Sequence, residues 1–373
     1  MSVLKVDTIT KADGTGSLSV PAESGTVVTT ASPSLGRRNI IINGAMQVAQ
    51  RGTSFSGLTS GQYTLDRHYL NMNTLGTWTV SQDTDAPDAF GNSLKLACTT
   101  ADASPATTDY LFSFQKLEGQ DLQQLKKGTS SAELVTVSFW VKSNKTGDIQ
   151  VNLVDNDNSR MVSSVVTINS SATWEYKTAT FVGDTTGAFD NDNAASLSLE
   201  IWYDAGSNFT SGTASTSWIA FDNTNRAAGV TLALGNSTSN YINITGVQLE
   251  VGSVATPFEH RSYGEELTLC QRYYSKSYNH DVAPQSNNSG GRVYFYMSPN
   301  TTSGTKGRSI EFPVHMRAIP SVTIYRESDG ASNVFNTGAT ANIATIGSGG
   351  FLGYATSNTS NELYAHWVAD AEL

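Results

Sequence analysis

The chain has 373 residues, enough for two or three domains that each bury a core of their own. Only 15% of the residues are charged and the net charge is -10, so we expect no nucleic-acid partner, which would need clustered Lys and Arg. Two cysteines are too few for a disulfide framework. No apolar stretch reaches the length of a membrane helix, so membrane insertion is not expected either.

Residues 1–37 are predicted to be a separate N-terminal segment containing a β-hairpin. Two short alternating runs, VLKVDTIT and GSLSVP, flank KADGTG, whose Asp-Gly pair is typical of a hairpin turn. A hairpin of this size buries too little surface to be stable alone. We therefore expect the segment to pack on a copy of itself or on another protein.

Residues 38–262 are predicted to form an antiparallel β-sandwich of the jelly-roll type. Ser, Thr, Asn and Gly dominate here, and runs that alternate apolar and polar residues are separated by turn-rich spacers. About a dozen such runs in one stretch fit a jelly roll. They include NIIING, YTLDRHYLNM, SLKLAC, LVTVSFWVKS, DIQVNLVD, WEYKTATFV, LSLEIWYD, SWIAFD and YINITGVQLEV, with a brief helical turn at GQDLQQLKKG.

Residues 263–281 contain GEELTLCQRYY, which is predicted to be a short linking helix. Leu267, Cys270 and Tyr274 recur at i, i+3 and i+7, as on one helical stripe. A catalytic thiol, a disulfide and a packing seam are the possible roles of Cys270. No histidine follows at a spacing that would activate the thiol, so we expect a buried cysteine beside Leu267.

Residues 282–373 are predicted to form a second, smaller β-sandwich at the C-terminal end of the sequence. Its candidate strands are RVYFYMS, SIEFPV, PSVTIYR, ANIATIG and ELYAHWVA, separated by loops rich in Gly and Asn. The fold class expected for the whole chain is thus all-β, with one short helix between two sandwiches.

The strand patterns of the jelly roll also predict which side chains face away from its core. In LVTVSFWVK, IQVNLV and LSLEIWYD, the apolar residues take alternate positions and should face the core. The opposite faces carry Trp140, Trp202, Glu200, Gln150 and Asn152. Aromatic and amide groups on an exposed face are typical of a sugar-binding platform, because rings stack on sugar C–H groups. Burial under a loop or against a neighbouring subunit is the competing interpretation.

No motif in the sequence indicates catalysis, a cofactor or a resident metal. There is no nucleophile elbow, P-loop or His-Glu-x-x-His, and the five histidines are scattered. Plentiful carboxylates leave a glycosidase pair open. The oxygen-rich runs at Asp155 and Asp190 fit Ca²⁺, and Asx turns explain them equally well. We expect a protein that is not an enzyme.

Several motifs resemble known families. SLKLA, AELVTVSFWVKSNKTGDIQVNLV, WEYKTATF and INITGVQLEVGS resemble jelly-roll carbohydrate-binding modules of glycoside hydrolases. RNIIINGAMQVAQRG, YTLDRHYL, VQLEVGSVATPFEHRSYGEELTLCQRYY and FPVHMRAIPSVTIY together resemble tail-fibre and related virion proteins of bacteriophages, as does the N-terminal LKVDTITKADGTGSLSVP. The chain lacks the long shaft of such fibres.

The resemblance implies a homotrimeric tail fibre located on the virion, which binds a host-surface polysaccharide. It implies that residues 1–37 attach to other tail or capsid proteins and that residues 282–373 form the receptor-binding tip. Leu267, Cys270 and Tyr274 would then lie in a helical collar where three chains meet. A purely structural virion component without a ligand is the alternative, and a glycan-cleaving spike is a third.

Overall fold

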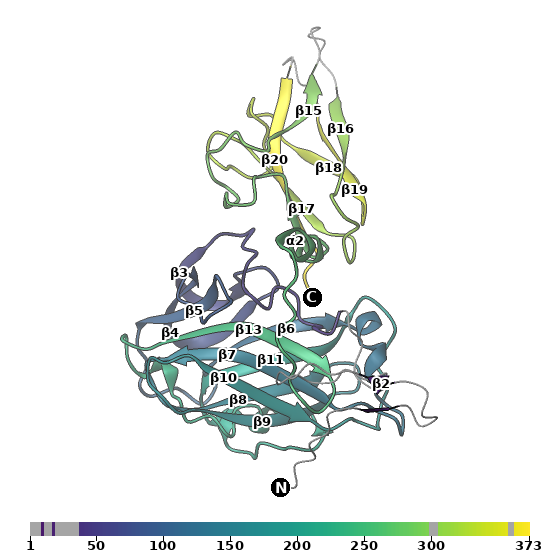
Figure 1. The fold of residues 1–373 in the computed structure, drawn as a ribbon. Helices are drawn as coiled ribbons and strands as arrows, with labels where there is room; N and C mark the ends of the chain where they lie inside the picture. Colours follow the sequence, from purple (N-terminus) through teal and green to yellow (C-terminus); the bar gives the residue numbers. More distant parts are fainter. Residues whose placement is uncertain (1–8, 11–16, 19–36, 298–304, 357–361) are drawn as a thin grey trace. The chain divides into compact units, whose positions relative to one another are not determined.

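A computed structural model describes residues 9–10, 17–18, 37–297, 305–356 and 362–373, and the chain divides into two compact units, residues 1–38 and 39–373. In the first unit, strands β1 (Ile9–Thr10) and β2 (Ser17–Leu18) pair antiparallel (Figure 1). This pairing confirms the predicted hairpin. The loop between the two strands lies outside the described residues.

The second unit begins with a jelly roll, in which every pair of neighbouring strands is antiparallel. The strand order is β10-β7-β13-β5-β4-β6-β11-β8-β9-β12, with β3 pairing with β4 (Figure 1). The elements are β3 (Ser54–Tyr63), β4 (Tyr69–Asp83), β5 (Ser93–Thr100), β6 (Tyr110–Glu118), β7 (Val135–Ser143), β8 (Gly147–Asp155), β9 (Arg160–Ile168), β10 (Glu175–Phe181), β11 (Ala195–Ala205), β12 (Ile219–Ala220) and β13 (Tyr241–Val251), with the short helices η1 (Gly119–Asp121), η2 (Gln123–Leu125), α1 (Ser207–Thr210), η3 (Asn223–Asn225) and η4 (Leu234–Asn236).

Strand β4 carries the sheet from one layer of the sandwich to the other. Its residues 69–73 pair with β6, and its residues 77–83 pair with β5. Between these halves Gly76 has φ 72, and a Cβ there would lie 2.3 Å from the carbonyl oxygen of Thr100. Only glycine fits this bend without strain. We call β10, β7, β13 and β5 the β7 layer, and β6, β11, β8 and β9 the β11 layer.

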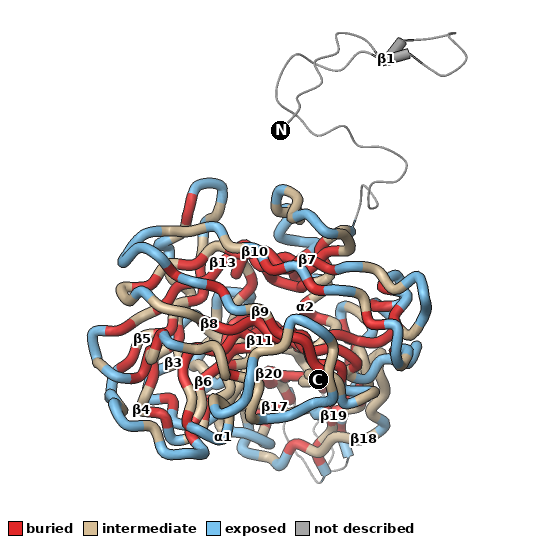
Figure 2. Tube along the Cα trace, turned by 90° about the horizontal axis from the view of Figure 1, so that it is seen from below, coloured by how far each residue is buried: buried red, intermediate tan, exposed pale blue. Residues whose placement is uncertain are grey.

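The two layers enclose one hydrophobic core, which Figure 2 shows as the buried strands between more exposed loops. The apolar alternation predicted in three strand patterns is confirmed, since all the residues concerned are buried in this core. They are Val135, Val137, Phe139, Val141, Ile149, Val151, Leu153, Leu197, Leu199, Ile201 and Tyr203. Burial of these side chains is the main stabilising contribution, at roughly 25 cal/mol for each Å² of apolar surface removed from water.

The predicted strand NIIING, at residues 39–44, is not a strand. Two of its backbone N–H groups bond side chains rather than the backbone of a neighbouring strand. The N–H of Ile42 donates to Oε1 of Gln115 at 2.8 Å, and that of Ile41 donates to Oδ1 of Asn39 at 3.0 Å. The alternating apolar pattern was present, but nothing in the sequence identified side-chain partners for these backbone groups.

Residues 274–373 form the second sandwich, with its own hydrophobic core. One sheet contains β14 (Tyr274–Lys276), β15 (Val293–Met297), β17 (Ser321–Tyr325) and β20 (Glu362–Asp370), and the other contains β16 (Lys306–Glu311), β18 (Asn342–Gly347) and β19 (Gly350–Ala355). Phe295, Phe312, Phe351 and Trp367 form an aromatic cluster in the core. The all-β class and the second sandwich are therefore confirmed.

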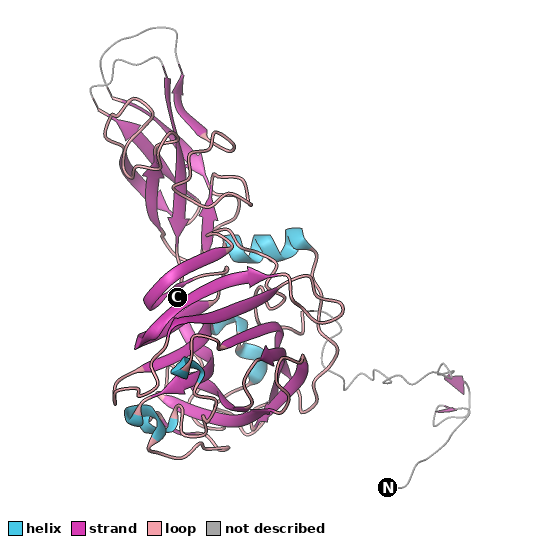
Figure 3. Cartoon of the chain, turned by 90° about the vertical axis from the view of Figure 1, so that its left-hand side faces the viewer, coloured by secondary structure: helices cyan, strands magenta, loops and turns pink. Residues whose placement is uncertain are grey.

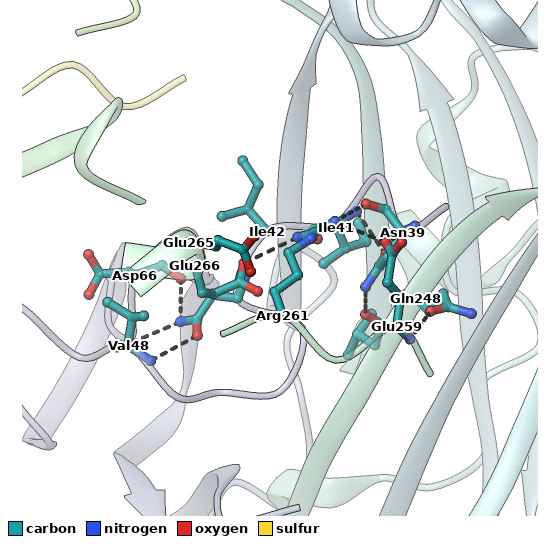
Figure 4. Close-up of polar contacts among 12 residues, drawn as sticks. Asn39, Ile41, Ile42, Val48, Asp66, Gln248, Glu259, Arg261, Glu265 and Glu266 are labelled. Atoms are coloured by element: carbon teal, nitrogen blue, oxygen red, sulfur yellow. Dashed lines mark hydrogen bonds and ion pairs between the residues drawn. The ribbon is translucent and has the colours of Figure 1, made fainter. Parts of the chain in front are cut away.

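Helix α2 (Tyr263–Gln271) links the two sandwiches in sequence and is drawn in cyan in Figure 3. A capping box begins it: Ser262 accepts from the N–H of Glu265, whose carboxylate accepts from the N–H of Ser262. The next acidic residue, Glu266, accepts from the N–H of Asn43 at 2.5 Å (Figure 4). Among the described residues, no helix is long and apolar enough to span a membrane.

The residues predicted to form a collar between chains are buried within one chain. Cys270 is fully buried and Leu267 is 9% exposed, and both pack against Ile42 and Val48 of the segment before β3. The buried, unpaired state of Cys270 is confirmed. Tyr274 is not on the helical stripe, because α2 ends at Gln271 and Tyr274 begins strand β14. A collar built from these three side chains is therefore wrong: each packs against its own chain, and none is more than 9% exposed.

Ion pairs join the jelly roll to the last residues of the sequence. Arg67 is 1% exposed and pairs with Glu372, whose other oxygen lies 3.2 Å from Arg51. On the jelly roll, Glu118 is fully buried and pairs with Arg272 at 2.6 Å. Buried charges of this kind are costly unless paired, so they fix one arrangement of the contacting segments.

Candidate functional site

Four of the five predicted platform residues come together on the β11 layer. Glu200 and Trp202 of β11 lie opposite Asn152 and Gln150 of β8 in the strand register. Nε1 of Trp202 donates to Oε2 of Glu200 at 2.8 Å, and Nε2 of Gln150 donates to Oδ1 of Asn152 at 2.8 Å. The predicted grouping of these side chains is thus present, but all four are at most 4% exposed.

Residues 206–231 cover this part of the β11 layer. Arg226 pairs with Glu200 at 2.5 Å, and its guanidinium lies 4.6 Å from the Trp202 ring centroid. The backbone oxygen of Arg226 accepts from Asn152 at 2.8 Å, and that of Asn225 accepts from Gln150 at 2.8 Å. The expectation that Trp202, Glu200, Gln150 and Asn152 form an open sugar platform is therefore wrong, because the chain itself occupies their face and their hydrogen bonds.

Trp140 lies on the other layer and cannot share a platform with Trp202. It stands on β7, directly opposite Tyr176 of β10 and Thr245 of β13. The centroids of the Trp140 and Tyr176 rings are 5.3 Å apart, with the ring planes tilted by 50°. Tyr176 is 43% exposed and Trp140 is partly exposed, so this pair presents aromatic surface to solvent.

The aromatic surface continues from Trp140 over strand β13. A bulge in β13 places Gly246 at φ 61, and a Cβ there would lie 2.7 Å from Cζ of Phe90 and 3.2 Å from Cδ1 of Trp140. The absence of a side chain at Gly246 lets both rings lie on the strand. Phe258 follows, with its centroid 5.1 Å from that of Phe90. We call Tyr176, Trp140, Phe90 and Phe258 the aromatic row.

Polar groups flank the aromatic row at one edge. Asp85 accepts from Lys142 at 2.7 Å and from Nε1 of Trp174 at 3.0 Å. The hydrogen bond from Lys142 lowers the pKa of Asp85, and the same bond raises the pKa of Lys142, so both groups stay charged at neutral pH. Thr178 is exposed and lies two residues after Tyr176 in β10, so both side chains are on the same face of the strand. An exposed ring surface with carboxylate, ammonium and hydroxyl groups beside it is suited to stacking on a sugar and bonding its hydroxyls.

The oxygen-rich run at Asp155 does not form an open calcium site. The ammonium of Lys127 lies 2.6 Å from Oδ2 of Asp155 and 3.2 Å from Oδ2 of Asp184, and it donates to the carbonyl oxygens of Thr186 at 2.8 Å and Gly187 at 2.7 Å. Lys127 thus occupies the centre of an oxygen cluster that would otherwise suit a cation. Within the described ranges, no group of three His, Cys, Asp or Glu side chains is arranged to hold a metal.

Sequence reasoning identified Trp140 but missed the other members of the row. Tyr176 has a clear signal in hindsight, since WEYKTATF alternates and places Trp174, Tyr176 and Thr178 on one face. Phe90 and Phe258 carry no such signal, because they lie in loops outside β5 and β13. Only the bulge at Gly246 and the loop paths bring them beside Trp140.

No family model matches the chain, and no curated protein matches its sequence. Solved structures give partial likenesses. The enzymatically active domain of tailspike protein 4 of bacteriophage CBA120 is 12% identical with a TM-score of 0.30, over 57% of this chain and 21% of that one. The family 11 carbohydrate-binding module of Clostridium thermocellum, in complex with a β-1,3-1,4-mixed-linked tetrasaccharide, is 12% identical with a TM-score of 0.28, over 55% and 99% of the two chains. A family 30 carbohydrate-binding module is 13% identical with a TM-score of 0.29, over 61% of this chain and 93% of that one. Likenesses of this size assign no function to the chain.

Proposed function

We propose that this protein is a non-catalytic adhesin that binds a host-surface glycan on the aromatic row of the β7 layer. The observation that carries the proposal is the pair formed by Tyr176 and Trp140, whose rings lie 5.3 Å apart with Tyr176 43% exposed. Large aromatic side chains normally bury most of their surface, so an exposed pair beside charged and hydroxyl groups favours a ligand. Sugars are the best match, since a ring face contacts C–H groups while Asp85 and Lys142 bond hydroxyls.

The setting we propose is a fibre or spike on a bacteriophage virion, with three copies of the chain in the assembly. Support comes from the sequence resemblance of residues 38–52, 63–70, 247–274 and 312–325 to phage fibre modules. A single shallow platform binds weakly, and linking several copies raises the apparent affinity by a factor of about 10² to 10⁴. Since Leu267, Cys270 and Tyr274 are buried within one chain, the contacts between chains would have to involve other residues.

The second sandwich offers a further surface for the same function. Tyr294 of β15 pairs with Tyr364 of β20, their ring centroids are 5.3 Å apart, and both are partly exposed. The guanidinium of Arg292 lies 4.5 Å from the Tyr364 centroid and is held by Glu327 at 2.8 Å. A receptor-binding tip in this domain would use these residues.

The experiment is a binding assay of the full chain on host cells, with Tyr176→Ala and the double variant Trp140→Ala/Tyr176→Ala. We expect at least about a tenfold loss of binding, equivalent to 1.4 kcal/mol, when stacking is removed. Phe221→Ala is a matched control, because Phe221 is 37% exposed and belongs to the segment covering the β11 layer. Full binding by a folded double variant would refute the platform. Release of reducing ends from host polysaccharide by the wild-type chain would refute the absence of catalysis.

A further inference from the structure

A cleft of about 800 Å³ lies where helix α2 meets the jelly roll and the start of the second sandwich. The jelly roll contributes Gln47, Ala49, Thr53 and Gln82, the helix contributes Tyr263 and Gln271, and residues 276–281 and Pro313 complete the wall. Its size falls within the range of small-molecule sites, roughly 300–1,000 Å³. The aromatic row contributes no residue to this wall, so the cleft is a separate feature of the molecule.

The side chain of Gln271 is the observation that points to a ligand. Gln271 is 8% exposed, it lines the cleft, and its amide makes no hydrogen bond with any described residue. The amide atoms of Gln271 are not among the buried polar atoms that the protein encloses without a partner, so they stay accessible from the cleft and can bond the hydroxyls of an occupant. Gln47, which is partly buried and also lines the cleft, makes no side-chain hydrogen bond within the described part of the chain either. Two amides are therefore available to one occupant.

The rim of the cleft supplies an aromatic surface. Tyr263 is the first residue of α2, and it is 46% exposed. Partial burial raises the pKa of its phenol, so the hydroxyl is neutral and can both donate and accept. A ring and amides that line the same cleft are a combination that recognises a sugar: the ring stacks on C–H groups, and the amides bond hydroxyls.

The charges around the cleft favour a neutral occupant. Burial lowers the pKa of Lys276 to about 8, and its ammonium is already held by the carbonyl oxygens of Gln50 at 2.7 Å and Val282 at 2.5 Å. This ammonium is therefore committed to the protein and offers little to an anion. Asp281 is exposed on the same wall and would repel one.

We propose that this cleft is a second saccharide site, which takes a neutral sugar unit with Tyr263 stacked on the ring and the amides of Gln271 and Gln47 bonded to its hydroxyls. The proposal rests on the proposed function only for the chemical class of the ligand. The cleft and the aromatic row use different residues, so each site can be removed while the other is kept. A chain with two sites would hold one branched or long glycan at two points, or two glycans at once.

The test uses the full chain and saturation-transfer NMR with methyl glycosides of glucose, galactose, mannose and N-acetylglucosamine, and methyl glucuronide as an anionic probe. The cleft is isolated by removing the aromatic row with Trp140→Ala/Tyr176→Ala. In that background we expect a neutral glycoside to keep its signal, and we expect Gln271→Leu to weaken binding about tenfold or more. Tyr263→Ala should weaken glycoside binding as well. This second variant keeps the proposal testable if the Gln271→Leu variant fails to fold.

Two controls separate the cleft from other effects. Gln124→Leu removes an exposed glutamine of η2 that does not line the cleft, and it should leave binding unchanged. Gln271→Leu should also leave the melting temperature within a few degrees, because its amide bonds no described residue. The proposal is overturned if no neutral glycoside binds the background without the aromatic row, if only the glucuronide binds, or if Gln271→Leu and Tyr263→Ala leave binding unchanged. If binding survives loss of the row and disappears with the cleft variants, the cleft stands. The row is judged separately: with the row intact, the cleft variants should keep a glycoside signal, and loss of all signal would refute the row while leaving the cleft.

Discussion

Replacing Lys127 with Met removes the cation at the centre of the oxygen cluster described above. The Lys127 side chain is 3% exposed, and the carboxylates it pairs with, Asp155 and Asp184, are 0% and 4% exposed. Methionine keeps an apolar stem of similar length and deletes the charge. Asp184 would keep its ion pair with Arg160 at 2.7 Å, whereas Asp155 would keep only the hydrogen bonds from Asn158.

The expected cost follows from leaving one buried charge without its partner. Breaking a buried ion pair by removing one member typically destabilises a protein by about 3–5 kcal/mol. The carbonyl oxygens of Thr186 and Gly187 lose a donor in addition. We therefore expect Lys127→Met to lower the free energy of unfolding by about 3–5 kcal/mol, measured by urea denaturation followed by circular dichroism.

The adjacent lysine provides a matched control. Lys126 has a side chain that is 54% exposed, and it pairs with Glu133 at 2.5 Å. Because exposed ion pairs contribute about 0–1 kcal/mol, Lys126→Met should cost less than about 1 kcal/mol. Adding Asp155→Asn to Lys127→Met should recover part of the lost stability, since it removes the orphaned charge. Equal effects of Lys126→Met and Lys127→Met, or no recovery in the double variant, would refute the reasoning.

Three further predictions concern stability. A chelator should leave the thermal unfolding midpoint unchanged, because Lys127 fills the oxygen cluster; a drop with EDTA would contradict this. Burial lowers the pKa of His68 from 6.5 to about 4, so the unfolded chain binds a proton at a higher pH than the folded chain does. The free energy of unfolding should therefore fall by about 3 kcal/mol as the pH falls from about 6.5 to 4. His68→Gln should flatten this part of the stability–pH profile, and an identical profile would show that His68 is not responsible. Gly246→Ala should lower the free energy of unfolding by about 1–2 kcal/mol, because Gly246 has a positive φ. It should also shift the fluorescence of Trp140, and an unchanged spectrum would mean that the aromatic row tolerates a Cβ at this position.

The local pattern of the sequence was sufficient for most of the fold. Alternation placed the core residues of β7, β8 and β11 correctly, because period-2 burial depends on neighbouring residues in one strand. The same holds for the N-terminal hairpin and for the short helix, which lies within the predicted linking segment 263–281. These features are encoded within a few residues, so no long-range information was needed.

The candidate site depended on contacts between distant residues. Trp140 and Trp202 look equivalent in sequence, since each alternates with core residues, and only the layer assignment and the cover formed by residues 206–231 make one exposed and the other buried. Leu267 and Cys270 look like an interface stripe, but the segment holding Ile42 and Val48 already covers them.

The sequence by itself therefore determined that the protein is all-β, which side of each main strand faces the core, and which segment forms the short helix. The tertiary structure decided which outward face stays open, which aromatic side chains share it, and which amide at the end of α2 lines the cleft without a hydrogen bond to any described residue. The physical reason is that alternation records only whether a side chain points toward the core of its own sheet. Whether another segment covers the opposite face depends on loop paths between residues that are far apart in the chain.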